Sequence, residues 1–355
     1  MNNITNMRVL LVSAVPPPEG GIATWTKRYI KYCDMHNIKL QLVNTALQGS
    51  RGKQINSRRR IFDEIKRTIF ILKGMKSTVK KNKVDIVHIN TSCSNFGLLR
   101  DYMCAKEAYV KRIPIVLHCH CNIEDQVTTR ISKMVLYKLS KISSVILTLN
   151  TDSKKYIDRL CKKEAKIVPN FVDESMICEN HLINNVIKEV VFVGHVQETK
   201  GCLEIIEAAK KLDYIHFTLV GPVSNQIKKI SLPENVSLLG EKKAPLIKNY
   251  LSNADVFLFP SYTEGFSLSL TEAMANGLPC IATDVGANKD MIEKNGGIII
   301  QTRSSEAIIE ALHRLESYDV RNRASVWNLQ KVKINYLPDK VMNSIFSIYE
   351  TVLIK

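Results

Sequence analysis

The sequence has no apolar run that approaches the roughly 20 residues needed to span a bilayer. It has no low-complexity tract, and its nine cysteines form no Cys-x-x-Cys pair. An odd number of cysteines without such a pair indicates reduced thiols, so we expect a cytoplasmic protein. The polar N-terminal residues run directly into a strand pattern, and we therefore expect no signal peptide. With 45% hydrophobic residues, the chain is of ordinary globular composition.

Length and pattern predict two domains of the α/β class. The 355 residues exceed one ordinary core. Short apolar runs, beginning at residues 7–13, alternate with helical patterns along the chain, which predicts doubly wound parallel sheets of the Rossmann type. Two such units in series would face a central cleft at the carboxyl ends of their strands. We place the first domain at residues 1–173 and the second at residues 174–334.

Positive charge is concentrated in the first half. Residues 1–170 hold 31 Lys and Arg against 12 Asp and Glu, whereas residues 171–355 hold 19 against 22. The densest part, residues 51–83, has twelve basic and two acidic residues, and its isoleucines Ile61, Ile65 and Ile69, with Leu72, recur at helical spacing. Such a helix suits an anionic membrane surface or nucleic acid. Alternatively its apolar side packs on its own domain, and the pattern leaves both interpretations open.

The most informative stretch is residues 254–277. An apolar run that ends at Pro260 predicts a buried strand, and a helical pattern follows and ends before Gly277. A strand, a loop and a helix in this order aim backbone N–H groups and the positive helix end at an anion. Glu264 lies in the loop and Glu272 in the helix, with seven residues between them. Taken as isolated acids, both would be solvated surface residues.

This stretch resembles the E-x7-E signature of the large bacterial glycosyltransferase family 4, whose members are retaining enzymes of GT-B architecture. The resemblance spans nearly the whole chain. It implies that residues 1–173 bind the acceptor, that residues 174–334 bind a nucleotide-sugar donor, and that a helix at about residues 335–355 packs back on the first domain. It also implies reaction on the front face of the sugar without a protein nucleophile.

The resemblance assigns roles to both acids. Glu272 would bind the ribose hydroxyls, because a carboxylate accepts two O–H hydrogen bonds well. Glu264 would face the hydroxyls of the donor sugar. The donor would also meet the backbone of the residues that follow Glu264, namely Gly265, Phe266, Ser267 and Leu268.

Residues 194–201 resemble the family's G-R-x4-K-G motif, in which Arg and Lys hold the donor diphosphate. Gly194 and Lys200 are in place, but His195 stands at the Arg position. Lys200, aided by His195, would stabilise the departing diphosphate. A neutral His195 would stabilise charge less well, and a protonated one would make activity depend on pH near its reference pKa of about 6.5. Without the resemblance, Lys200 would be an ordinary surface lysine.

The first domain supplies three further candidates. Gly20 and Gly21 lie at a strand-to-helix turn, where backbone can approach a phosphate or sugar, although such a pair is more often a simple turn. In the family this loop lies against the donor phosphates and the acceptor. His120 matches a family histidine near the acceptor hydroxyl and the donor sugar, and His118 lies one strand repeat earlier. The run from His118 to Cys121 is not expected to bind metal, because successive strand side chains face opposite sides.

No Asp-x-Asp occurs in the sequence, which disfavours a metal-bound diphosphate. We therefore predict no catalytic metal and no cofactor. The catalytic roles fall to His120, Lys200 and Glu264.

The resemblance predicts a hexosyltransferase that moves a hexose or N-acetylhexosamine from a nucleoside diphosphate sugar, with UDP preferred and GDP left open, to a glycan hydroxyl. The charge placement favours an acceptor on polyprenyl diphosphate, in cell-surface polysaccharide synthesis, and a peripheral enzyme at the inner face of the cell membrane. Two rivals remain. A GT-B sugar-nucleotide epimerase would need no acceptor. A nucleic-acid-binding protein would leave Lys200 and both acids idle, and interleaved aromatic residues are few, so we expect no nucleic-acid partner.

Overall fold

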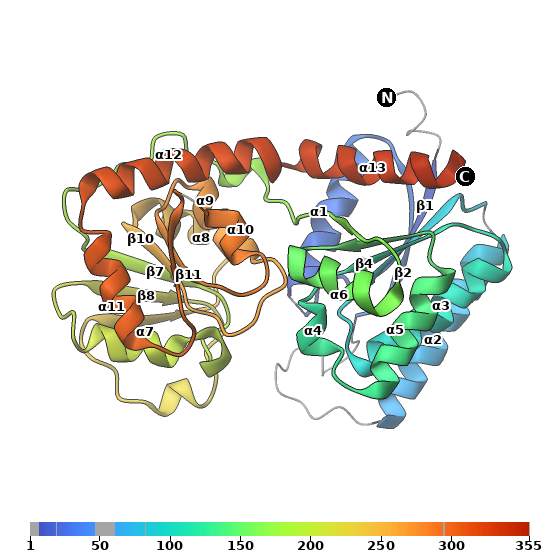
Figure 1. Cartoon of the computed structure of the whole chain (residues 1–355), viewed down its shortest axis with the longest axis horizontal. Helices are drawn as coiled ribbons and strands as arrows, with labels where there is room; N and C mark the ends of the chain where they lie inside the picture. The colour runs from blue at the N-terminus through green and yellow to red at the C-terminus, as the bar shows by residue number, and fades with distance from the viewer. Residues whose placement is uncertain (1–6, 19, 47–60, 82, 294, 355) are drawn as a thin grey trace. The chain divides into compact units, whose positions relative to one another are not determined.

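The computed structural model divides the chain into two compact units. Unit 1 is Met1–Asn170 with Val341–Lys355, and unit 2 is Phe171–Lys340. The boundary expected from the sequence lies nearby, after Asp173. The structure describes residues 7–18, 20–46, 61–81, 83–293 and 295–354 (Figure 1).

Unit 1 is built on a six-stranded parallel sheet in the order β2-β1-β3-β4-β5-β6. Its strands are β1 (Arg8–Ser13), β2 (Lys39–Asn44), β3 (Ile86–Thr91), β4 (Ile115–Cys119), β5 (Val145–Thr148) and β6 (Lys166–Ile167). Its helices are α1 (Gly21–Met35), α2 (Ile61–Lys81), α3 (Asn95–Val110), α4 (Ile123–Gln126), α5 (Arg130–Ile142), α6 (Thr151–Cys161) and most of α13 (Pro338–Ile354).

Unit 2 repeats this design in the order β12-β11-β10-β7-β8-β9, again all parallel. Its strands are β7 (Glu189–Val193), β8 (His216–Val220), β9 (Val236–Gly240), β10 (Val256–Phe259), β11 (Cys280–Thr283) and β12 (Gly297–Ile300). Its α-helices are α7 (Cys202–Ala209), α8 (Ala244–Asn253), α9 (Leu268–Ala275), α10 (Asn288–Ile292), α11 (Ser305–Arg314) and α12 (Tyr318–Asn335), and 3-10 turns lie at Glu174–Met176, Glu198–Lys200 and Ile227–Lys229. The predicted α/β class with two doubly wound parallel sheets is confirmed.

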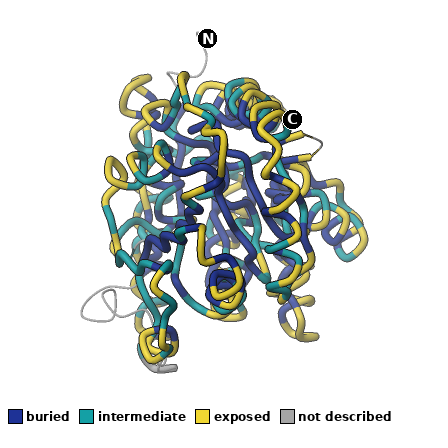
Figure 2. The backbone as a smooth tube through the Cα atoms, turned by 90° about the vertical axis from the view of Figure 1, so that its left-hand side faces the viewer, coloured by how far each residue is buried: buried dark blue, intermediate teal, exposed yellow. Residues whose placement is uncertain are grey.

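Both sheets are buried on their two faces, as parallel sheets require. Every residue of β3, β4, β5, β10 and β11 is buried, and Figure 2 shows the strands as the dark interior of the chain. Most of these strand residues are Val, Ile, Leu and Phe. The exceptions in β3 and β4 include His88, Asn90 and His118, and such buried polar side chains need partners inside the sheet.

The strand orders define where each unit can bind a ligand. In unit 1 the order reverses between β1 and β3, and in unit 2 it reverses between β7 and β10. Ligands of such sheets bind at the carboxyl ends of the strands that flank this reversal. In unit 2 these strand ends lead into Gly194 and Pro260. The predicted donor motifs therefore lie at the switch point of their sheet.

The helices differ from the sequence pattern in two places. Helix α1 begins at Gly21 itself rather than after the glycine pair, and Gly20 is its N-cap. Helix α2 buries Ile71 and Met75, whereas Ile65 and Ile69 of the expected apolar stripe are exposed. The basic residues 47–60 lie outside the described part of the chain. Among the described residues, no helix is long and apolar enough to span a membrane.

Candidate active site

Glu264 lies in a loop that follows β10 and is held by main-chain hydrogen bonds. The Tyr262 N–H donates to the Thr199 carbonyl over 3.0 Å, and the Ala287 N–H donates to the Gly265 carbonyl over 3.1 Å. Since both partners come from other turns, the loop is clamped on two sides. The conformation of Glu264 is therefore set by contacts that are distant in sequence.

Two glycines make this clamping possible. Gly201 has φ +73°, and a Cβ there would lie 2.2 Å from the Pro260 carbonyl oxygen. Gly286 has φ +56°, and a Cβ there would lie 2.1 Å from the Glu264 carbonyl oxygen. Both positions combine a left-handed backbone with a contact that no side chain fits. The Glu264 loop thus packs between two glycine turns.

Lys200 and Glu264 form an ion pair in unit 2, donated from Nζ to Oε1. The side chains are 23% and 12% exposed, and Nζ lies 5.7 Å from the centroid of the Phe259 ring. Two residues that the sequence assigned to different parts of the donor are thereby brought together. The pair holds a cation at the switch point, where an anionic group can reach it.

His195 follows Gly194 at the end of β7 and is half-buried. Burial lowers the pKa of His195, the neighbouring Lys200 lowers it further, and Glu241 opposes both. A neutral imidazole is therefore favoured near pH 7, so His195 lacks the positive charge that an arginine would carry at this position. The preceding turn is tight as well, because a Cβ at Gly221 would lie 1.9 Å from the Gly194 carbonyl oxygen.

Helix α9 begins directly after the Glu264 loop. Ser267 caps it, with its Oγ accepting from the Leu270 N–H over 3.1 Å, and Leu268 is its first residue. Glu272 is half-buried on the same helix. The Phe266 ring is buried edge-on against Tyr336, with ring centroids 5.3 Å apart, which leaves its backbone as the part suited to meet a donor.

In unit 1, Gly20 and Gly21 open helix α1 and both are exposed. A Cβ at either position would meet no atom within 4 Å. Packing therefore does not require glycine here. The first N–H groups of α1 have no partner within the helix, so this exposed helix end suits an anion or a sugar.

His120 lies just beyond β4, at the same edge of the sheet as the α1 turn. Its Nε2 is 3.1 Å from Asn90 Oδ1, and Trp25 stands edge-on to its ring at 5.0 Å. Burial, with a smaller effect of His88, lowers the pKa of His120 to about 3. The ring is therefore neutral near pH 7.

His118 does not share this position. It is 0% exposed, and neither ring nitrogen makes a hydrogen bond of normal geometry with a described residue. Burial and the neighbouring His120 and His88 hold the pKa of His118 well below its usual value. Of the two histidines, only His120 can meet a substrate.

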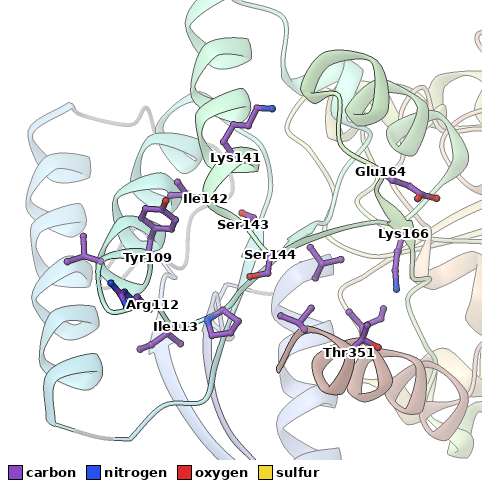
Figure 3. A pocket seen from close by; sticks show the side chains of 15 residues that line it. Tyr109, Arg112, Ile113, Lys141, Ile142, Ser143, Ser144, Glu164, Lys166 and Thr351 are labelled. Atoms are coloured by element: carbon purple, nitrogen blue, oxygen red, sulfur yellow. The ribbon is translucent and has the colours of Figure 1, made fainter. Parts of the chain in front are cut away.

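The described part of the chain offers no cluster of metal ligands, and one of its pockets lies apart from these residues. Among the described residues, no three or more His, Cys, Asp or Glu side chains are grouped so as to hold a metal ion. A pocket of about 870 Å³ lies at the opposite edge of unit 1's sheet, where β4 and β5 begin and α13 forms a wall (Figure 3). None of the predicted site residues lines this pocket.

Comparison with known proteins agrees with these motifs. The family model described as Glycosyltransferase Family 4 matches residues 19–175, and the one described as Glycosyl transferases group 1 matches residues 177–328. The chain is therefore a glycosyltransferase, with one of these two glycosyltransferase domains in each half. It is an enzyme, and the curated relatives named below are glycosyltransferases as well.

Two curated relatives resemble this glycosyltransferase over most of their length. The UDP-Gal:α-D-GlcNAc-diphosphoundecaprenol α-1,3-galactosyltransferase of Escherichia coli is 28% identical over 72% of this chain and 74% of its own. The 2-deoxystreptamine N-acetyl-D-glucosaminyltransferase of Niallia circulans is 25% identical, over 77% of each chain.

Solved structures share the fold of this glycosyltransferase. Anabaena HepE in complex with UDP and glucose matches with a TM-score of 0.72 and 14% identity, over 98% of this chain and 100% of that one. The GT-B architecture predicted from the E-x7-E resemblance is thus confirmed. The roles of the individual residues stay predictions.

Sequence patterns missed several residues that shape the site of this glycosyltransferase. Gly201, Gly221 and Gly286 allow the backbone contacts described above, and glycines in the loops that follow strands were the available signal. Asn90 is not among the site residues that the sequence predicts. A buried amide inside an apolar strand was the signal that could have singled it out.

The Gly286 contact predicts a sharp effect of adding one methyl group. Gly286→Ala should strain the backbone and displace the Glu264 loop, which should weaken donor binding at least about tenfold. Gly240→Ala is the matched control, because Gly240 also has a left-handed φ of +69° but open space around its Cβ. It should lose only about 1–2 kcal/mol of unfolding free energy and keep donor binding. Calorimetric titration and urea unfolding would measure both, and equal donor affinity in the two variants would contradict the clamp.

The buried histidines predict that unit 1 is less stable in acid. The unfolded chain takes up protons below about pH 6.5, whereas His118 and His88 stay neutral in the folded state, so stability is full above that pH and falls below it. Each such histidine should remove about 1.4 kcal/mol per pH unit. His118→Leu should therefore reduce the loss of unfolding free energy with falling pH by about 1.4 kcal/mol per pH unit.

This pH dependence can be followed for unit 1 alone. Trp25 and Trp327 are the two tryptophans, so a Trp327→Phe background leaves Trp25 as the reporter of unit 1. Urea unfolding would be recorded from about pH 7 to about pH 5. Parallel slopes with and without His118→Leu would contradict the assignment.

Proposed function

We propose that this glycosyltransferase is a retaining enzyme that moves a hexose or N-acetylhexosamine from a UDP-sugar to a hydroxyl of a lipid-linked glycan. The observation that carries the proposal is the Lys200–Glu264 pair at the switch point of unit 2. A cation beside a fixed carboxylate suits a substrate that joins a diphosphate to a hydroxyl-bearing sugar.

Each residue of unit 2 has a distinct task in this proposal. Lys200 stabilises the charge that develops on the leaving diphosphate, with the start of α7 behind it. Neutral His195 donates a hydrogen bond to the same group. Glu264 accepts hydrogen bonds from the donor sugar, and its bond to Lys200 keeps both side chains in place before the donor arrives. Glu272 holds the ribose, and no metal or cofactor is required.

The assignments of the donor and of the acceptor are supported by different observations. For the donor, HepE binds UDP and glucose in a structure of the same fold, and the E. coli relative is named for UDP-galactose. For the acceptor, the same relative is named for GlcNAc on diphosphoundecaprenol. A polyprenyl diphosphate sugar is therefore the acceptor class that we assign to this chain.

Nucleotide binding tests the donor site. UDP and UDP-sugars should raise the melting temperature more than GDP and its conjugates. Glu272→Ala should abolish that rise, because the ribose loses its partner. Glu310→Ala, which removes an exposed helical acid of the same unit, is the control and should respond as the wild type does. Stabilisation of Glu272→Ala equal to wild type would overturn the ribose assignment.

Product analysis tests the reaction itself. Incubation of the stabilising UDP-sugar with a polyprenyl diphosphate sugar should give one new glycoside with the anomeric configuration of the donor, measurable by NMR. An inverted product would refute retention. A changed free sugar nucleotide without acceptor would instead indicate the epimerase.

We propose further that unit 1 docks on an anionic membrane surface. Helix α3 packs beside both α2 and α5, and all three carry exposed apolar side chains. At α3 these recur on one helical face. We call this set the apolar patch: Ile65, Ile69, Phe70, Phe96, Leu99, Met103, Tyr109, Val110, Ile131, Met134 and Tyr137.

Cations accompany the apolar patch. On α5, the exposed residues Arg130, Lys133 and Lys138 form no ion pair with a described residue. Apolar side chains that enter the lipid boundary, with cations beside them, match an anionic bilayer surface. This placement would bring the enzyme to an acceptor held in the membrane.

Vesicle binding tests the apolar patch. Ile131→Glu with Met134→Glu should lower binding to phosphatidylglycerol-containing vesicles at least about tenfold, because two apolar groups are lost and two negative charges gained. Ile334→Glu is the matched control, since Ile334 of unit 2 is 66% exposed and Ile131 is 71% exposed. Reversal of Arg58, Arg59 and Arg60 should weaken binding as well. Unchanged sedimentation with vesicles in the patch variant would refute docking through this surface.

A further inference from the structure

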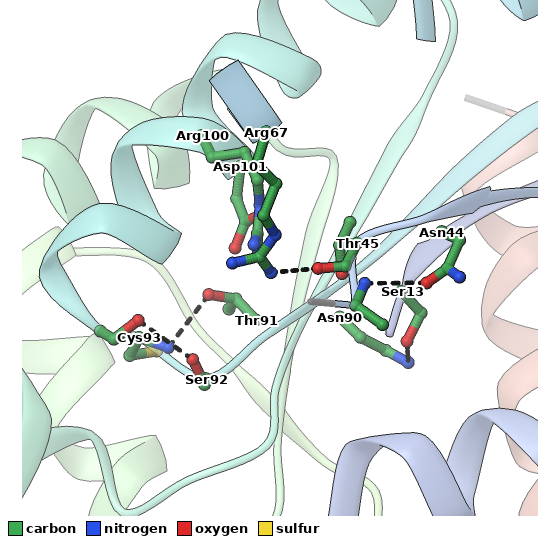
Figure 4. A network of polar contacts seen from close by, with 12 residues as sticks. Ser13, Asn44, Thr45, Arg67, Asn90, Thr91, Ser92, Cys93, Arg100 and Asp101 are labelled. Atoms are coloured by element: carbon green, nitrogen blue, oxygen red, sulfur yellow. Dashed lines mark hydrogen bonds and ion pairs between the residues drawn. The ribbon is translucent and has the colours of Figure 1, made fainter. Parts of the chain in front are cut away.

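Asn90 occupies a buried position between His120 and the end of β1. It is 2% exposed and pairs in register with His118 of the neighbouring strand. Its Nδ2 donates to Ser13 Oγ over 2.9 Å (Figure 4). Its Oδ1 lies 3.1 Å from His120 Nε2. Both ends of one amide are thus engaged, one by the candidate site histidine and one by a serine hydroxyl.

The direction of these hydrogen bonds follows from the next two links. Thr26 Oγ1 donates its single proton to the Ile22 carbonyl over 2.8 Å. In its 2.6 Å contact with Ser13, Thr26 must therefore accept, and Ser13 must donate. A carbonyl oxygen of helix α1, which cannot donate, thus fixes the direction of the chain.

The same reasoning continues to the histidine. The Ser13 hydroxyl donates its only proton to Thr26. In its hydrogen bond with Asn90 it can therefore only accept. The NH₂ group of Asn90 consequently faces Ser13, and its oxygen faces His120. Because that oxygen can only accept, His120 Nε2 must carry the ring proton. No hydrogen bond among the described residues uses His120 Nδ1.

We propose that Asn90 is a positioning residue that holds His120 as the Nε2–H tautomer, so that Nδ1 presents a lone pair to a substrate hydroxyl. This inference rests on the proposed function only for the substrate that supplies the hydroxyl. The tautomer itself rests on four hydrogen bonds within unit 1.

The environment also decides what His120 can do with this lone pair. A general base works best when its pKa is near the working pH, and burial holds the pKa of His120 at about 3. His120 therefore accepts a hydrogen bond without taking the proton. It orients a hydroxyl, and the proton that the reacting acceptor loses passes to the departing diphosphate.

Histidine NMR on the full-length protein tests the tautomer without any substrate. The protein is labelled with ¹⁵N-histidine, and the His120→Gln variant identifies the signals of this ring among the eight histidines. In long-range ¹H–¹⁵N spectra, only Nε2 couples strongly to both carbon-bound ring protons, because it lies two bonds from each. We expect that nitrogen to be protonated in the wild type and Nδ1 to be bare. A protonated Nδ1, or a mixture of tautomers, would overturn the inference.

Asn90→Ala tests whether Asn90 is responsible. The His120 signals should change to a tautomer mixture, and kcat of transfer should fall at least about tenfold, while UDP affinity of unit 2 stays unchanged. Asn150→Ala is the matched control, because Asn150 is also a buried asparagine of unit 1, but it caps α6 by accepting from the Ser153 N–H. It should lower stability and leave the His120 tautomer as it is.

The outcomes separate this inference from the proposed function. An unchanged tautomer in Asn90→Ala refutes the role of Asn90. If His120 becomes a tautomer mixture in Asn90→Ala but kcat is unchanged, the use of Nδ1 by a substrate is refuted. If the wild type has the expected tautomer but transfers no sugar to any acceptor, the proposed function fails and the tautomer assignment stands.

Discussion

The site of unit 2 depends on contact between main-chain segments. Gly201 packs on Pro260, Gly221 on Gly194, and Gly286 on the Glu264 carbonyl, each at a distance that excludes a Cβ. Such contacts leave the turns little freedom, and they come from strands on both sides of the switch point. The Lys200–Glu264 ion pair is a result of this packing. Its geometry is set by the backbone before a donor binds, which is the preorganisation that charge stabilisation in catalysis requires.

In unit 1 the main constraint is that the buried sheet carries polar side chains, which must be neutral or hydrogen-bonded. The histidines of β3 and β4 can be buried only as neutral rings, since a charged ring would lose its hydration. Asn90 is accommodated by hydrogen bonds at both ends of its amide. Burial lowers the pKa values of these histidines, and the hydrogen bonds that satisfy the buried Asn90 amide are the ones from which we infer the tautomer of His120. Stability and site chemistry in this unit have one physical origin.

Charge has separate roles in the two units. The excess cations of unit 1 include α5 side chains that are exposed beside the apolar patch and form no ion pair with a described residue. In unit 2, the cation of the site, Lys200, is partly buried and paired with Glu264. Exposed charge acts at long range and weakens with salt, whereas a fixed pair acts on a ligand at contact distance. The net charge of unit 1 therefore favours binding to an anionic surface, whereas net charge does not predict the donor site of unit 2.

Local patterns determined much of this protein. Alternating strands and helices predicted the two parallel sheets, and the spacing of Glu264 and Glu272 predicted a loop acid and a helix acid, because strand and helix periodicity is a property of neighbouring residues. The tertiary structure alone decided what depends on distant residues. It paired Lys200 with Glu264, which lie 64 positions apart in the sequence. It showed that Ile65 is exposed, whereas one interpretation of the sequence had the apolar side of this helix packed on its own domain. It also separated the buried His118 from the more accessible His120. Burial and hydrogen-bond partners come from other strands, and no local pattern contains them.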